Sequence, residues 1–211
     1  MVRVADEQAV EDQQRIAEIT FRKVPDPQRV EAERDAGFRF RIADADPQAW
    51  QKSWAVNLLG PVLLTRAALS FLRSCHGNVI NVSSGAAINA VQGWAAYCSA
   101  KAALNHFTRL LAEEEPEITS IAFRPGAVET AMQAVIRQEG AQGMSEERLA
   151  GFVRLHKEGE LLPPEVPGCA LAVLAVYAPH EWSGAFVPWN HEELQSLVRR
   201  YACGVGLPST M

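Results

Sequence analysis

Apolar and polar residues alternate with two different periods along most of the chain. From Asp46 onward, long runs with helical spacing are separated by shorter β-branched runs. Asp46 followed by Pro47 is typical of a helix start, and Pro116 is expected to end a helix. Alternating strands and helices favour a parallel α/β sheet covered on both faces. The pattern predicts helices over residues 47–73, 95–115, 164–177 and 191–201, and strands over residues 78–84, 118–123 and 184–188.

The first part of the chain follows no such pattern. Residues 1–50 carry 19 charged side chains and a single glycine, Gly37, whereas the other 161 residues carry 26 charges and 13 glycines. A polar helix fits residues 5–20, and residues 38–42 alternate as an extended piece would. We interpret residues 1–43 as an atypical segment and residues 44–211 as one α/β domain. Within the domain, residues 128–160 are expected to form a mobile helical segment.

Composition excludes several classes of protein. With 48% apolar residues and a formal net charge of −5, the chain is neither wholly disordered nor typical of a nucleic-acid binder. Its four cysteines lack metal-ligand spacing, so they are expected to be reduced thiols of a cytoplasmic protein. No apolar signal core follows Met1, and residues 169–178 are too short for a bilayer, which needs about 20 residues. We therefore expect a soluble protein without membrane partners.

A tyrosine and a lysine four residues apart are the strongest chemical feature. Tyr97 and Lys101 fall on one face of a predicted helix, where the ammonium can lower the phenol pKa from its usual value of about 10. Such pairs are also common on solvated faces. Ser84 ends a predicted strand, so its hydroxyl can reach the same substrate oxygen as the phenol. Asn57 is an amide in an apolar helix, where it serves either the site or the core.

Four residues in this order resemble the Asn-Ser-Tyr-Lys tetrad of the short-chain dehydrogenase/reductase family. They are Asn57, Ser84, Tyr97 and Lys101, and the motifs around them read NVSS, YCSAK and RPGAVET over about residues 44–190. The sequences of residues 93–105 and 182–184 resemble most the benzil reductase and sepiapterin reductase branch of the family. The resemblance implies a three-layer Rossmann-like sheet and NAD(P)-dependent reduction of a ketone or an aldehyde.

The resemblance also implies a role for each residue of the tetrad. Tyr97 would donate a proton to the carbonyl oxygen, and Ser84 would orient that carbonyl. Lys101 would lower the Tyr97 pKa and hold the ribose of the coenzyme, while Asn57 would hold a water of a proton relay. The coenzyme would be NADP or NAD, with NADP slightly preferred.

Further residues would surround the coenzyme and the substrate. Trp94, Met132 and the lid formed by residues 131–160 would shape the substrate pocket. The resemblance implies a homodimer through helices 47–73 and 95–115, the alternative being that their apolar faces are buried within one chain. The coenzyme contacts implied are Tyr97, Lys101, Pro125, Gly126, Val128, Thr130 and Asp6.

The chain departs from the family in its first part. The glycine-rich TGxxxGxG loop, which binds pyrophosphate at a helix N-terminus, is absent, since Gly37 is the only glycine before Gly60. The NNAG motif is also missing. Residues 2–10 resemble the family's third strand, with Asp6 as an adenine contact or as an ordinary solvated residue. We therefore expect the first βαβ unit to be absent, with weak coenzyme affinity and marginal solubility.

This departure keeps a second hypothesis open. The chain would then be a truncated, catalytically impaired relative that acts as a partner subunit or has no independent activity. Other chemistries are disfavoured by the sequence. The five histidines are scattered, so no metal site is predicted, and the residues around Ser84 do not form the GxSxG motif of serine hydrolases.

Overall fold

A three-stranded parallel sheet forms the centre of the computed structural model, which describes residues 41–201. Its strands are β1 (Asn78–Val82), β2 (Thr119–Arg124) and β3 (Phe186–Pro188), in the order β1-β2-β3. All three run in parallel, as the predicted α/β sheet requires. Predictions for Asp6, the helix over 5–20 and the extended piece over 38–42 fall wholly or mostly outside the described residues.

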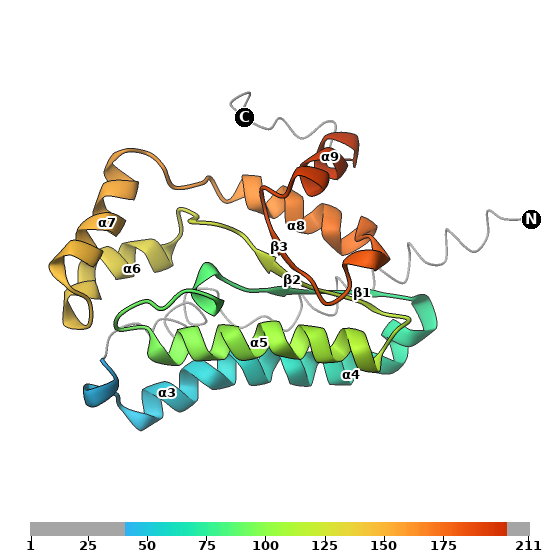
Figure 1. The fold of residues 1–211 in the computed structure, drawn as a ribbon, viewed down its shortest axis with the longest axis horizontal. Coiled ribbons are helices and arrows are strands. Elements are labelled where there is room, and N and C mark those ends of the chain that lie inside the picture. The colour runs from blue at the N-terminus through green and yellow to red at the C-terminus, as the bar shows by residue number, and fades with distance from the viewer. Residues whose placement is uncertain (1–40, 202–211) are drawn as a thin grey trace, which may run out of the picture.

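Helices cover both faces of the sheet, so the predicted layers are confirmed (Figure 1). On one face lie α3 (Pro47–Trp54), the π-helical turn η2 (Ala55–Leu59), α4 (Gly60–Cys75) and α5 (Ala95–Glu114). On the other lie α8 (Glu165–Tyr177) and α9 (Glu192–Tyr201). Beyond the carboxyl ends of the strands lie α6 (Ala131–Glu139) and α7 (Glu146–Lys157). Short 3-10 turns occur at η1 (Ile42–Asp44), η3 (Gly85–Ala87), η4 (Gly140–Gln142) and η5 (His180–Trp182).

Local interactions set the two ends of the long helix formed by α3, η2 and α4. The Asp46 carboxylate accepts hydrogen bonds from the backbone N–H groups of Gln48 and Ala49, at 3.1 and 3.2 Å. These bonds satisfy donors that a helix start leaves free. The helix ends at His76, whose left-handed φ of 49° cannot continue it. The predicted helix over 47–73 is therefore present, with a π-helical turn that the sequence pattern did not predict.

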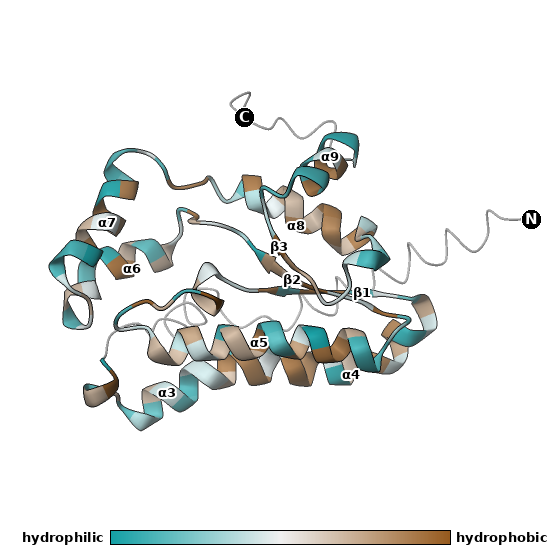
Figure 2. Cartoon of the chain, in the orientation of Figure 1, coloured by the Kyte–Doolittle hydropathy of each residue, from teal (hydrophilic) through white to brown (hydrophobic). Residues whose placement is uncertain are grey.

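The core lies around β2, which α5 covers on one face and α8 and α9 cover on the other. Ile121 and Phe123 are at most 1% exposed and pack with Leu174 and Leu194. Brown, apolar residues mark this layer along β2 and α8 (Figure 2). Burying a side chain of the size of Phe123 contributes about 1.5–3 kcal/mol, so this cluster anchors the middle strand.

The helix from Pro47 to Cys75 corrects one expectation. Residues 169–178 are too short to cross a bilayer, whereas this helix has the length and the composition to do so. Only 11% of its most apolar window is buried. In the structure its polar residues Ser53, Asn57 and Thr65 are the buried ones, on the side that packs within the fold. Its outward face is therefore the apolar one.

Candidate active site

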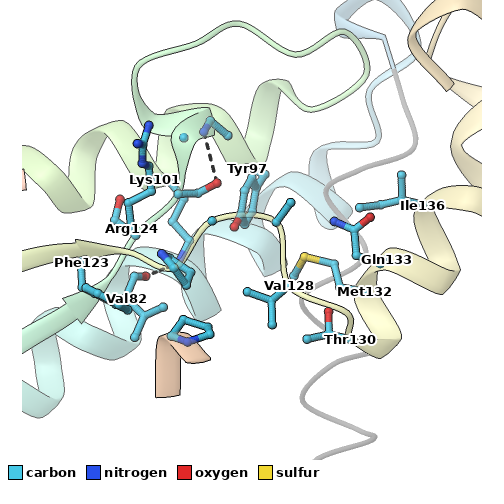
Figure 3. Close-up of a pocket in the computed structure, with 18 of the residues that line it drawn as sticks. Val82, Tyr97, Lys101, Phe123, Arg124, Val128, Thr130, Met132, Gln133 and Ile136 are labelled. Carbon is cyan, nitrogen blue, oxygen red and sulfur yellow. Dashed lines mark hydrogen bonds between the residues drawn. The ribbon is translucent and has the colours of Figure 1, made fainter. Parts of the chain in front are cut away.

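A pocket of about 520 Å³ opens at the carboxyl ends of β1 and β2 (Figure 3). This is the edge at which open α/β sheets bind ligands. Its walls come from η2, β1 and the turn after it, α5, the segment after β2, and α6, α7 and α8. All four residues of the predicted tetrad line it, namely Asn57, Ser84, Tyr97 and Lys101.

Tyr97 and Lys101 lie one turn apart on α5, and each is 6% exposed. The Lys101 Nζ donates a hydrogen bond to the Val82 carbonyl at 2.9 Å and lies 5.6 Å from the centroid of the Tyr97 ring (Figure 3). The alternative of a solvated helix face is excluded because both side chains are buried. A buried ammonium beside a phenol can stabilise the phenolate form, which is what acid–base work by a tyrosine requires.

Ser84 lies two residues beyond the strand rather than at its end. β1 ends at Val82, although the Ser83 N–H still donates to the Phe123 carbonyl at 2.7 Å. The Ser84 backbone remains extended, and its Oγ accepts a hydrogen bond from the Ala86 N–H at 3.2 Å. The predicted strand over 78–84 is thus too long by two residues, because the chain turns into η3 here. The hydroxyl nevertheless reaches the pocket.

Asn57 belongs both to the core and to the site, the two roles that its sequence position allows. It is 2% exposed, lies in the π-helical turn, and its Nδ2 donates to the Ser53 carbonyl at 3.0 Å. It also lines the pocket. Short π-helical turns are frequent at functional sites because they displace one side chain from the regular helical register.

Buried polar pairs beneath the pocket join β1 to α5. The Ser83 Oγ donates to the Asn105 Oδ1 at 2.5 Å, and the Asn81 Nδ2 donates to the Thr108 Oγ at 3.0 Å. These residues were not predicted. The available signal is that Asn81 and Ser83 alternate within a strand that had to be buried. The pairs fix the position of α5, and therefore of Tyr97, against the strand.

The segment after β2 supplies the backbone that the resemblance implies for coenzyme binding. Pro125, Gly126, Val128 and Thr130 all line the pocket. Gly126 has a φ of +85°, and a Cβ there would lie 2.7 Å from the Trp189 Nε1, so only glycine fits. Thr130 holds the N-cap position of α6, yet its side chain makes no capping hydrogen bond, which leaves the hydroxyl available for a ligand.

Glu129, in the segment after β2, pairs with a residue of each helix of the predicted lid, α6 and α7. The Glu129 carboxylate pairs with Arg137 of α6 at 3.3 Å and with the His156 Nδ1 of α7 at 2.9 Å. The hydrogen bond from His156, helped by Arg137, holds the pKa of Glu129 below its usual value. The predicted helical segment over 128–160 is thus present as α6 and α7, and it is anchored at Glu129.

One wall of the pocket is apolar and aromatic. Trp94 stacks on Phe152 with ring centroids 5.5 Å apart and meets the Tyr97 ring edge-on at 5.8 Å. Met132 and Ile136 of α6 extend this wall. Trp94 and Met132, which the resemblance implies for the substrate pocket, both line this cavity, and so does Phe152, which was not predicted.

Gln133 and Cys98 lie close to this wall. Gln133, buried in the pocket wall, was not predicted, although its spacing of three from Ile136 places it on the inner face of α6. Cys98 packs against the same cluster, and burial raises the pKa of its thiol, as suits a packing residue.

Residues that could hold other groups were also located. Between residues 41 and 201, no group of three or more His, Cys, Asp and Glu side chains is placed to hold a metal ion. A nicotinamide coenzyme fits the described residues at its nicotinamide-ribose end, where the Lys101 ammonium, the Thr130 hydroxyl and the Gly126 backbone face one cavity. Asp6, the expected adenine contact, lies outside the described residues.

Comparison with known proteins agrees with this geometry. A family model described as short chain dehydrogenase matches residues 35–141. An uncharacterised oxidoreductase of Schizosaccharomyces pombe is 39% identical over 151 residues, which cover 71% of this chain and 61% of that protein. A benzil reductase of Saccharomyces cerevisiae that forms (S)-benzoin is 38% identical over 158 residues, covering 72% of this chain and 60% of that protein.

A solved structure is similar over the same region. The crystal structure of a short-chain dehydrogenase/reductase from Saccharomyces cerevisiae has a TM-score of 0.73 and 38% sequence identity, and the match covers 75% of this chain and 63% of that chain. The chain spans about 60% of the length of the two curated relatives described above.

Proposed function

The chain belongs to the short-chain dehydrogenase family, and we propose that it reduces a ketone or an aldehyde with NADPH or NADH. One observation carries the proposal. Asn57, Ser84, Tyr97 and Lys101 come from three separate parts of the chain and line one pocket, which is the convergence that a proposed active site must show. The aromatic wall and the similarity to a benzil reductase support an aromatic carbonyl compound as the substrate.

Each residue has a task that its position supports. Tyr97 donates a proton to the carbonyl oxygen as the carbon is reduced, and the Ser84 hydroxyl orients that oxygen. Lys101, already bound to the Val82 carbonyl, stabilises the phenolate that remains. Asn57, held by the Ser53 carbonyl, positions a water that returns a proton towards Lys101.

The coenzyme supplies the hydride when it is bound. Lys101 and the Thr130 hydroxyl would hold its ribose and carboxamide, with the backbone of Pro125, Gly126 and Val128 beside the ring. The glycine-rich loop that would hold the pyrophosphate is absent from residues 1–56. We therefore propose weak coenzyme binding, and the second hypothesis, a partner subunit or a chain without independent activity, rests on this feature.

A coenzyme titration decides between the two hypotheses. Fluorescence of NADPH or NADH is followed while the protein is added, at coenzyme concentrations up to the millimolar range. A saturable change supports the reductase. No change with either coenzyme at millimolar concentration contradicts it and favours the second hypothesis.

Substitution of the proton donor tests the mechanism. Tyr97→Phe removes only the phenol oxygen, so turnover should fall by at least about 100-fold while coenzyme binding stays within about twofold. Tyr177→Phe, an exposed tyrosine on α8, is the matched control and should retain full turnover. Equal turnover of Tyr97→Phe and wild type would remove Tyr97 from this role.

Location and assembly complete the proposal. The three cysteines of the described part, Cys75, Cys98 and Cys169, form no disulfide bond there, which supports a cytoplasmic location. We propose a homodimer formed through α4 and α5, because large apolar side chains lie exposed on both helices.

A further inference from the structure

An arginine in the pocket wall has no protein partner. Arg124, the last residue of β2, lines the pocket and is half-buried. Within the described part of the chain, its guanidinium makes no hydrogen bond and no ion pair. The described lining contains no aspartate or glutamate, and its other charged side chain, Lys101, already binds the Val82 carbonyl. Charged groups that leave bulk water are usually paired, so this guanidinium indicates an anionic ligand.

Arg124 lies beside the residues that would hold the reacting carbonyl. The Ser83 N–H donates to the Phe123 carbonyl at 2.7 Å, which places the ends of the two strands side by side. A Cβ added to Gly85 would lie 3.9 Å from the Arg124 Cδ, so this arginine borders the residue that follows Ser84. Because Gly85 has no side chain, a ligand can extend from the Ser84 hydroxyl towards the guanidinium.

The aromatic wall lies on the other side of the catalytic tyrosine. Figure 3 shows Arg124 on one side of Tyr97 and Met132 of α6 on the other. Met132 packs in the cluster that also contains Trp94 and Phe152. A ketone whose carbonyl lies at Tyr97 can therefore place an aryl group on the α6 side and an anionic group at Arg124.

We propose that Arg124 is a specificity-determining residue that binds a carboxylate of the substrate. The preferred substrates are then aryl ketones that carry a carboxylate on the chain beyond the carbonyl, which makes them aromatic oxo acids. This inference rests on the proposed function, since it assumes that the reacting carbonyl lies at Tyr97.

A guanidinium suits a carboxylate better than it suits a neutral group. Its planar fork of N–H donors matches the two carboxylate oxygens, and the two groups carry opposite charges. The carboxylate takes no part in the reduction. Hydride from the coenzyme adds to the carbonyl carbon and the Tyr97 proton adds to its oxygen, so the product is a hydroxy acid. A neutral ketone leaves the guanidinium unpaired, and the site discriminates against it.

Two ligands that differ in charge test the inference. 3-Benzoylpropanoate and 3-benzoylpropanamide share a carbon skeleton and are nearly equal in size. Calorimetric titration in the presence of millimolar NADP⁺, which cannot reduce a ketone, measures their affinities without turnover. The wild type should bind the acid about tenfold more tightly than the amide, as expected for a charge-assisted hydrogen bond at a partly exposed site. Arg124→Gln should lose this preference while its affinity for the amide changes less than about twofold.

Matched variants separate charge from folding. Arg154→Gln removes an arginine of α7 that is 69% exposed and outside the described lining, so it should keep the wild-type preference. Arg124→Lys keeps the charge without the planar fork and should retain a preference of about threefold. Arg124→Gln should melt within about 2 °C of the wild type, because the guanidinium it removes bonds no described residue. A merely structural arginine would instead lower the melting temperature and weaken both ligands equally.

Kinetics supply a second measurement where turnover is detectable. In Arg124→Gln the KM for 3-benzoylpropanoate should rise about tenfold while kcat stays within about twofold, because the carboxylate is bound equally in the ground state and the transition state. The KM for the amide should stay unchanged. A fall in kcat for both ligands without a change in KM would contradict a role in substrate binding.

The outcomes distinguish this inference from the proposed function. Equal affinities of the wild type for the acid and the amide, or an unchanged preference in Arg124→Gln, overturn the inference even if the protein is an active reductase. Weaker coenzyme binding in Arg124→Gln with the preference intact would assign Arg124 to a coenzyme phosphate and overturns it as well. A preference that depends on Arg124 in a protein without any reductase activity supports the inference and contradicts the proposed function.

Discussion

Single buried hydrogen bonds hold β1 and the residues that follow it against α5. Asn105 is 9% exposed and accepts the Ser83 hydroxyl, so its removal leaves that hydroxyl buried without a partner. Asn105→Ala should therefore lower the free energy of unfolding by about 2 kcal/mol, as measured by urea denaturation. His106→Ala changes the exposed neighbour on the same helix and should stay within about 0.5 kcal/mol. Similar losses in both variants would contradict this account.

Gly126 offers a second test, because strain and crowding combine there. Its φ of +85° disfavours any other residue, and an added Cβ would meet Trp189 and Leu162 at 2.7 and 2.9 Å. Gly126→Ala should cost about 2–3 kcal/mol of unfolding free energy, from a strained backbone plus side chains that must move. Gly159 is the matched control, since its φ is +70° but nothing lies within 4 Å of the added atom. Gly159→Ala should cost about 1 kcal/mol, and equal costs would exclude crowding as a factor.

How far single residues can be predicted from sequence depends on whether they belong to a motif. Tyr97 and Lys101 were predictable because their spacing and their neighbours are specific. Gln133 belongs to no motif, and only its spacing from Ile136 placed it on the inner face of α6. Whether a buried amide has a partner depends on the packing of several elements, which no local pattern reports.

At the scale of elements, Glu129 joins three segments through its carboxylate. Its hydrogen bond from His156 and its pair with Arg137 hold the pKa of Glu129 below the usual value in the folded protein. A lowered folded pKa means that the carboxylate stabilises the fold above about pH 4.3, the usual value for glutamate, and that this contribution is lost as the pH falls through the lower folded value.

The corresponding prediction compares melting temperatures over a pH series from 7 to 3. Glu129→Gln should melt below the wild type at neutral pH, and the difference should shrink to zero in acid. Glu158→Gln is the control, because Glu158 pairs only loosely with Arg154, at 3.8 Å, and both side chains are exposed. A pH-independent difference for Glu129→Gln would show that the loss comes from packing and not from charge.

Element boundaries followed from the sequence where a local signal exists. Asp46, Pro47 and Pro116 mark helix ends by their own chemistry, so the first two long helices were predicted within two residues. The π-helical turn at Asn57 was not predicted, because a one-residue shift in helical register leaves the apolar pattern almost unchanged. The end of β1 was placed two residues too late, because the Ser83 N–H still bonds the Phe123 carbonyl and the Ser84 backbone stays extended beyond Val82.

At the scale of the whole molecule, large apolar side chains lie exposed on the outer face of α4 and α5, where a partner would bury them. Leu59 of η2 and Leu63 and Leu64 of α4 are 50–62% exposed, and Leu110 of α5 is 47% exposed. Exposed leucines on neighbouring helices of this kind mark an interaction surface. The sequence predicted that these helices carry apolar faces, but only the packing shows which side remains outside, because Ser53, Asn57 and Thr65 turn inward.

We propose that a second copy of the chain buries this apolar face. Analytical ultracentrifugation tests the proposal. The wild type should be a dimer at micromolar concentration, and Leu59→Ser with Leu63→Ser should shift it to monomers by removing two apolar contacts from each partner. Val176→Ser, equally exposed but on α8 across the sheet, should leave the dimer intact. A wild type that stays monomeric up to 100 μM, or one that floats with neutral phospholipid vesicles, would contradict the dimer. Flotation would assign the apolar helix Pro47–Cys75 to a bilayer, for which it has the length and the composition.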